Sequence, residues 1–175
     1  MKNLLVTGKP GVGKTTAVLR ALELSGVPAR GFVTREIRGP RGRLGFELRT
    51  LDGRVDTLAS VELAGPPRVG KYGVNLAALE KLGVPEIEAA VSEGLLLVVD
   101  EIGKMELFSE SFRAAILRAL DSSTPVLATI TKSRHPVAER IKARPDVQVV
   151  EITAANRDSV VQEVLLPWIH QVAKR

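Results

Sequence analysis

Eight consecutive residues near the start of the chain match the phosphate-binding pattern G-x-x-x-x-G-K-[ST]. Its glycines let the backbone turn so that successive N–H groups surround a phosphate. Lys14 can reach the terminal phosphates as a point charge, and the Thr15 hydroxyl is a suitable Mg²⁺ ligand. We predict that phosphate groups bind to this loop and to the start of the following helix. The predicted binding residues are Gly8, Lys9, Pro10, Gly11, Val12, Gly13, Lys14, Thr15 and Thr16.

Two carboxylates follow an apolar run in the middle of the chain. The run at 95–99 reads LLLVV, and Asp100 and Glu101 come directly after it. In open α/β sheets, ligands bind beyond the carboxyl ends of the parallel strands. We predict that Asp100 holds Mg²⁺ through water and that Glu101 acts as the general base on the attacking water. In the alternative interpretation, the two carboxylates merely end the strand and face solvent.

The residues after Asp100 also allow a test for regulatory GTPases. Asp100 and Gly103 fit the pattern D-x-x-G, whose glycine senses the γ-phosphate in those proteins. A guanine-specific switch further needs N/T-K-x-D after a later strand. The segment 131–134 reads TKSR and ends in Arg134 where that pattern requires a carboxylate. The sequence therefore disfavours a guanine-specific switch.

Short apolar runs alternate with amphipathic stretches along the chain. This alternation is typical of an α/β domain with a mainly parallel central sheet flanked by helices. The predicted strands cover 3–7, 31–36, 95–99, 125–131 and 147–152. The predicted helices cover 14–24, 75–93 with a break near 83–85, 109–120 with Ser109 as N-cap, 135–144 and 158–173. The phosphate loop thus lies between the first strand and the first helix.

The segment from about 39 to 60 has a different pattern. Apolar and polar residues alternate in it, and two turn signals, GPRG at 39–42 and LDGR at 51–54, interrupt the alternation. We predict an antiparallel hairpin or meander that extends the edge of the sheet.

Length and composition limit the remaining choices. The 175 residues, 45% hydrophobic and 26% charged, fit a single globular domain over 1–175. The absence of cysteine excludes disulfides, cysteine nucleophiles and zinc–thiolate sites. No apolar run approaches the about 18 residues of a membrane span. We expect a cytoplasmic protein without membrane partners, and the excess of arginine over lysine favours a thermophilic source.

Several sequence blocks resemble one family, the small P-loop nucleoside-triphosphatases that include the cancer-related nucleoside-triphosphatase. The blocks are GKPGVGKTT at 8–16, GFVTREIR at 31–38, RLGFEL at 43–48, VGKYGVNL at 69–76, DEIGKMEL at 100–107 and EITAANRD at 151–158. The resemblance implies a Mg²⁺-dependent hydrolase of broad base preference that releases phosphate from ATP, GTP and other triphosphates. It also implies a RecA-like sheet in which the strand at 125–131 lies between those at 3–7 and 95–99.

The basic residues give the chain a net charge of +5. Most of them fit solvated faces with local ion pairs, but one or two could stabilise the charge of the transferring phosphoryl group. Our candidates are Lys71 and Lys104, each within a resemblance block, with Arg134 as a third choice. Asn156 and Arg157 could border the base or ribose, or instead form the start of the closing helix. Nucleic acid is an unlikely partner because the few aromatic residues do not interleave with a basic stripe.

These features make hydrolysis of nucleoside triphosphates to diphosphate and phosphate the first hypothesis. We expect a monomer with slow turnover, because no partner that supplies an arginine is evident. Two alternatives stay open: a small nucleotide or nucleoside kinase, and a module in which hydrolysis times binding to nucleic acid or protein. A kinase has no need of a carboxylate placed to activate water, so Glu101 disfavours the first of them.

Overall fold

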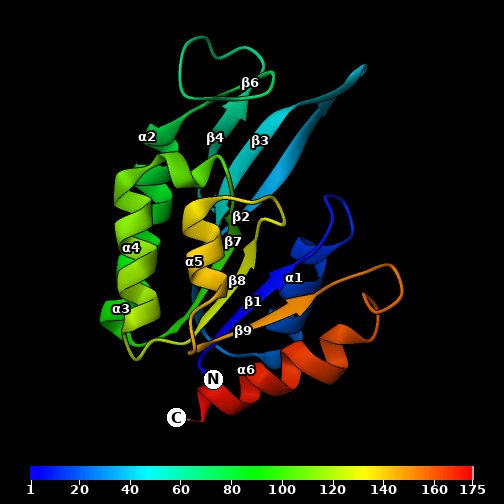
Figure 1. The fold of residues 1–175 in the computed structure, drawn as a ribbon, viewed down its shortest axis with the longest axis vertical. Helices are drawn as coiled ribbons and strands as arrows, with labels where there is room; N and C mark the ends of the chain where they lie inside the picture. The colour runs from blue at the N-terminus through cyan, green and yellow to red at the C-terminus, as the bar shows by residue number, and fades with distance from the viewer. Residues whose placement is uncertain (175) are drawn as a thin grey trace.

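The computed structural model describes residues 1–174 and shows a central sheet with helices on both faces (Figure 1). In the described residues the sheet has nine strands in the order β5-β6-β4-β3-β2-β7-β8-β1-β9. The strands are β1 (Asn3–Thr7), β2 (Ala29–Gly39), β3 (Gly42–Thr50), β4 (Val55–Ser60), β5 (Arg68–Val69), β6 (Tyr72–Val74), β7 (Leu96–Ile102), β8 (Val126–Ile130) and β9 (Val147–Glu151). This arrangement confirms the predicted fold class.

The half of the sheet that carries the phosphate loop is parallel. β1 pairs with β8 and β9, and β7 pairs with β8 and with the first residues of β2. Helices α1 (Lys14–Ser25) and α6 (Leu166–Ala173) cover one face (Figure 1). The other face carries α3 (Val84–Glu93), α4 (Glu110–Asp121) and α5 (Pro136–Lys142). β8 lies between β1 and β7, which confirms the strand order that the resemblance implied.

The other half of the sheet is antiparallel and begins with the pairing of β2 and β3. This strand pairs in parallel with β7 from Ala29 to Phe32, and in antiparallel with β3 from Phe32 to Gly39. The hairpin of β2 and β3 projects beyond the parallel strands (Figure 1). The predicted extension at 39–60 is confirmed, but it begins earlier, within β2, and continues through β5 and β6 to Val74.

The predicted helix break near 83–85 is wrong, because the chain stays helical there. α2 (Leu76–Ala78) leads into a π-helical turn, η1 (Leu79–Gly83), and then directly into α3. A proline ring clashes with the carbonyl four residues earlier in an α-helix, and the wider π-turn before Pro85 removes that clash. A π-helical turn also precedes Pro167, where η3 (Val161–Leu165) leads into α6. The closing helix therefore begins later than the predicted 158.

The helix that follows β7 agrees with its prediction. The Ser109 hydroxyl accepts the backbone N–H of Phe112 at 3.1 Å, so Ser109 is the N-cap of α4. A short 3₁₀ turn, η2 (Glu106–Phe108), connects β7 to this cap. No helix within residues 1–174 is long and apolar enough to cross a membrane.

Candidate active site

The phosphate loop connects β1 to α1, and its path depends on glycine. Gly11 and Gly13 have φ angles of +76° and +110°, in the region that L side chains rarely adopt. Gly8 lies against the residue that follows β9, since a Cβ atom on it would stand 2.6 Å from the Ile152 carbonyl oxygen. Glycine is thus required both for the turn of the loop and for its close approach to the neighbouring strand.

Lys14 is the first residue of α1, and its side chain folds back over the loop. Its Nζ donates to the carbonyl oxygens of Gly8 at 2.8 Å and Lys9 at 3.3 Å. The ammonium group therefore lies beside the loop backbone, where the start of α1 adds its own partial positive charge. An anion in the loop would meet both charges together.

Asp100 accepts hydrogen bonds from three other elements. Its Oδ2 accepts from the Thr15 hydroxyl at 2.6 Å and from the Thr34 backbone N–H at 3.4 Å. Its Oδ1 accepts from the Thr129 hydroxyl at 2.5 Å. Burial raises the pKa of Asp100, and these hydrogen bonds oppose that rise. With 3% of its surface exposed, Asp100 does not face solvent, so the alternative interpretation is wrong for this carboxylate.

Glu101 is the next residue of β7, which continues past the predicted strand end at 99. The register with β8 shifts between Val99 and Ile102, and the peptide bond between Asp100 and Glu101 is cis. Burial raises the pKa of Glu101 most, the charge of Asp100 raises it further, and Lys14 opposes the rise. Glu101 borders the same hollow as the phosphate loop.

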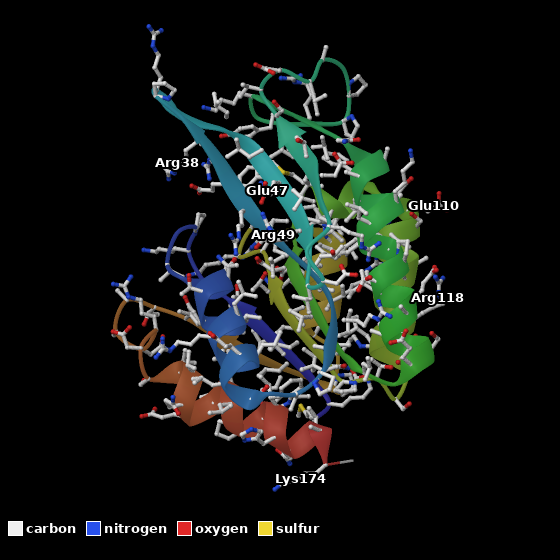
Figure 2. All side chains as sticks on the ribbon, turned by 180° about the vertical axis from the view of Figure 1, so that it is seen from behind. Arg38, Glu47, Arg49, Glu110, Arg118 and Lys174 are labelled. Atoms are coloured by element: carbon white, nitrogen blue, oxygen red, sulfur yellow. The ribbon has the colours of Figure 1, made fainter. Side chains whose placement is uncertain are left out.

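This hollow, about 690 Å³ in volume and named here the phosphate hollow, lies between the phosphate loop, β7 and the antiparallel hairpin. The hairpin contributes three arginines to its lining: Arg35, Arg38 and Arg43. Figure 2 shows Arg38 on the strand that projects past the loop. Charge patterning alone predicts solvated faces for these arginines, so they are site residues that sequence reasoning missed. The sequence feature that could have identified them as site residues is their position within the blocks GFVTREIR and RLGFEL.

Neighbours on the hairpin and on β6 hold two of these arginines. Arg43 pairs with Glu36 at 2.9 Å and donates from Nε to the Tyr72 hydroxyl at 3.0 Å. Its guanidinium carbon lies 5.1 Å from the centroid of the Phe46 ring. Arg38 pairs with the other oxygen of Glu36 at 2.7 Å. One carboxylate therefore restrains two cations at the edge of the phosphate hollow and offsets part of their charge.

The two lysines predicted to assist at the phosphates lie apart from each other. Lys71 borders a second hollow, of about 660 Å³, that includes Pro10 of the loop together with Arg38 and Arg43. Lys104 borders a smaller hollow, of about 180 Å³, that Glu101 shares but the phosphate loop does not. The structure thus places Lys71 at the rim of the site and Lys104 on the far side of Glu101. The third candidate, Arg134, is exposed between β8 and α5.

On its other side, the loop borders a hollow of about 590 Å³, whose lining includes Arg20 and Arg157. Asn156 serves a different purpose. Its Oδ1 accepts the Thr153 N–H at 2.8 Å, and its Nδ2 donates to the Glu151 carbonyl oxygen at 2.9 Å. Of the two residues considered for the base or ribose, Arg157 lines this hollow of about 590 Å³. Asn156 instead stabilises the turn before the closing helix by its hydrogen bonds.

Comparisons with known proteins extend over this whole arrangement. A family model described as "NTPase" matches residues 3–165. "Nucleoside-triphosphatase THEP1" of Thermotoga petrophila is 49% identical over 162 residues, which cover 93% of this chain and 90% of the relative. "Cancer-related nucleoside-triphosphatase" of Homo sapiens is 40% identical over 180 residues, with coverage of 94% and 95%.

Among solved structures, the crystal structure of THEP1 from the hyperthermophile Aquifex aeolicus matches with a TM-score of 0.85 at 36% identity. The match covers 93% of this chain and 96% of that one. The resemblance seen in the sequence blocks is thereby confirmed. The chain belongs to the NTPase family and is a nucleoside-triphosphatase.

Proposed function

We propose that the protein hydrolyses the γ-phosphate of nucleoside 5′-triphosphates in the phosphate hollow, with Mg²⁺, slow turnover and broad base preference. One observation carries the proposal: Glu101, Lys14 and the phosphate loop border one hollow of about 690 Å³. A general base must lie within reach of the water that attacks the phosphorus. The products are the nucleoside diphosphate and phosphate.

The residues around Asp100 fit Mg²⁺. This ion prefers oxygen ligands and is usually held by one or two carboxylates, waters and substrate phosphates. The Thr15 hydroxyl lies 2.6 Å from Asp100 at the start of α1, so the two side chains can serve one coordination shell, Asp100 through water. When bound, Mg²⁺ supplies positive charge that neutralises the phosphate oxygens.

The chain's own groups carry the remaining steps. Glu101 takes a proton from the attacking water while the new oxygen–phosphorus bond forms, and the electron pair of the broken bond stays on the diphosphate oxygen. The raised pKa of Glu101 makes it a better proton acceptor than an exposed glutamate. Lys14 and the loop N–H groups hold the phosphates in place and stabilise the charge that develops on them.

The pairing of the hairpin arginines supports slow turnover. An arginine placed on the transferring phosphoryl group can raise the rate by about 10³-fold or more. Here Glu36 binds both Arg38 and Arg43, so neither guanidinium presents its full charge to the phosphate hollow. Such a site hydrolyses its substrate without the full benefit of a free arginine.

The exposed residues beside the loop support broad base preference. Strong discrimination between bases needs buried polar groups that only the right base can satisfy. Arg20 and Arg157, which line the hollow beyond the loop, are both exposed. Flexible guanidinium groups of this kind stack on any base and therefore favour no single one.

The test is release of phosphate from a panel of nucleoside triphosphates, with Mg²⁺ and with chelator, for the wild type and Glu101→Gln. We expect comparable turnover on the different bases, loss of activity with chelator, and a fall of about 10²- to 10⁴-fold for Glu101→Gln. Glu110→Gln, which neutralises an exposed carboxylate at the start of α4, is the matched control.

Each part of the proposal has a contrary result. Equal rates for Glu101→Gln and the wild type would remove Glu101 from the mechanism. A strong preference for one base would contradict the proposal that the exposed Arg20 and Arg157 contact the base without selecting it. Transfer of the phosphoryl group to added nucleosides or monophosphates, in place of free phosphate, would favour a kinase.

A further inference from the structure

A second glutamate lies buried close to the proposed general base. Glu106 opens the 3₁₀ turn after β7 and has 4% of its surface exposed. In the described residues this carboxyl forms no ion pair with a lysine or arginine, and the largest influences on its pKa are burial, the charges of Glu101 and Asp100, and two backbone N–H groups. By contrast, the other deeply buried glutamate, Glu86, pairs with Arg30 at 3.3 Å and with Arg54 at 2.5 Å. A buried acid without a cation is costly unless it stays neutral.

Gly103 brings the two glutamates together. A Cβ atom on Gly103 would stand 2.7 Å from Glu101 Oε1 and 3.0 Å from Glu106 Oε2. Both carboxyl oxygens therefore lie beside Gly103, near enough to each other for one water molecule to bridge them. A larger residue at 103 would have to displace the ends of both side chains.

Both carboxyl groups also border the hollow of about 180 Å³, together with Lys104, Thr34 and Thr131. One water molecule takes about 30 Å³ of liquid volume, so this hollow has room for water between the two side chains. Glu101 borders the phosphate hollow as well. It therefore stands between the phosphate hollow on one side and the smaller hollow with Glu106 on the other.

The chemical state of Glu106 follows from these surroundings. Burial, reinforced by the charge of Glu101, raises the pKa of Glu106 well above its usual range. Two neighbouring carboxyl groups do not both ionise readily, and burial favours the neutral form of Glu106, the more deeply buried of the two. A neutral carboxyl has an O–H donor, which an ionised one lacks.

We propose that Glu106 is a positioning residue that donates a hydrogen bond, through one water in the small hollow, to the Glu101 carboxylate. This inference rests on the proposed role of Glu101. The bond turns Glu101 toward the phosphate hollow and restricts its rotation. The proton stays on Glu106 throughout, and Glu101 alone exchanges a proton with the attacking water.

The test compares two substitutions of similar size. Glu106→Met fills the same space without a donor, and Glu106→Gln keeps a donor in the form of its amide N–H. We expect kcat of Glu106→Met to fall about 10- to 100-fold, as for other groups that orient a catalytic side chain, while the affinity for nucleotide is unchanged. Glu106→Gln should recover most of that loss.

A double variant separates positioning from mere support of the fold. If Glu106 acts through Glu101, then Glu101→Gln with Glu106→Met is no slower than Glu101→Gln alone. Thermal unfolding and nucleotide affinity, measured on each variant, identify any that is misfolded. Glu110→Gln again serves as the exposed control.

Three results would overturn the inference: wild-type kcat for Glu106→Met, equal losses for the Met and Gln variants, or additive losses in the double variant. Failure of the proposed function is a separate observation. In that case Glu101→Gln itself hydrolyses at the wild-type rate, whatever the variants at 106 do.

Discussion

The two halves of the sheet differ in burial, and they contribute differently to the site. Every residue of β1 and β8 is buried, whereas β3 and β4 contain exposed and buried residues along their length. Strands covered on both faces have their side chains fixed by neighbours, while an antiparallel extension leaves a face to charged residues. The parallel half thus holds the phosphate loop and Asp100 in place, and the extension sets arginines opposite them.

Because of this difference, we expect the parallel half and the extension to contribute unequally to hydrolysis. Asp100 is held by hydrogen bonds from α1, β2 and β8, so its orientation is determined by several elements. The side chains of Arg38 and Arg43 are 70% and 38% exposed, and water screens their charge. We therefore expect changes in the parallel half to abolish turnover and changes in the extension to weaken it.

The largest effect is expected for Lys14→Ala in the parallel half. Loss of the ammonium group beside the loop should lower kcat/KM by at least about 10²-fold, because in the proposed mechanism this group stabilises phosphate charge in the transition state. Phosphate release under Mg²⁺ measures the change. Lys81→Ala removes the same charge from an exposed position on η1 and should behave as the wild type. Turnover near that of the wild type in Lys14→Ala would contradict the leading part given to the parallel half.

A smaller effect, about tenfold on kcat, is expected for Arg43→Met in the extension. Its guanidinium borders the phosphate hollow but shares its charge with Glu36. Arg41→Met, at the exposed hairpin tip, is a control with the same loss of charge on the same hairpin. Equal losses for both variants would mean that only net charge matters, and a loss as large as that of Lys14→Ala would remove the difference between the halves.

The sequence predicts the parallel half well and the extension only in outline. Strands buried on both faces are apolar runs, so β1, β7 and β8 could be recognised with small errors at their ends. β2 was predicted too short because it changes partner at Phe32, from β7 to β3, and local pattern does not show where such a change occurs. The π-turn before Pro85 was missed because a proline is compatible with either a break or a widened turn.

The same distinction holds within the site. Lys14, Thr15 and Asp100 could be proposed because each belongs to a short pattern next to a buried strand. Arg43 could not, since its position depends on packing against Tyr72, which is 29 residues away along the chain. Glu106 carries no signal of its own, because only the fold shows that a glutamate is buried beside Glu101.

A third prediction concerns stability and the buried carboxyl of the parallel half. The pKa of Glu106 is raised well above its usual range by burial, so over the interval between the unfolded and folded values the folded state binds more protons. The free energy of unfolding of the wild type therefore falls as pH rises through this interval. Glu106→Gln has no titrating carboxyl at this position, so its stability lacks this pH dependence. The melting temperature of the variant minus that of the wild type should therefore increase by several degrees between about pH 5 and about pH 8. Parallel curves for the two proteins would contradict a neutral Glu106.

The smallest effect is expected where the two halves are joined. Arg54, in the turn between β3 and β4, donates to Glu86 of α3 at 2.5 Å, and Arg30 also pairs with this glutamate. Arg54→Ala should lower the melting temperature by only a few degrees, because half-exposed ion pairs are weak and Arg30 still compensates Glu86. Removal of both arginines should cost more than the sum of the single changes, since it leaves a buried charge unpaired.

Turnover of Arg54→Ala, measured where the protein is folded, should match the wild type. The pair lies away from the phosphate hollow and acts on the attachment of the extension, not on the position of its arginines. A fall in kcat as large as that for Arg43→Met would show that the ion pair sets the geometry of the hairpin over the loop. The extension would then be a part of the catalytic framework as rigid as the parallel half, and the division between the two would not hold.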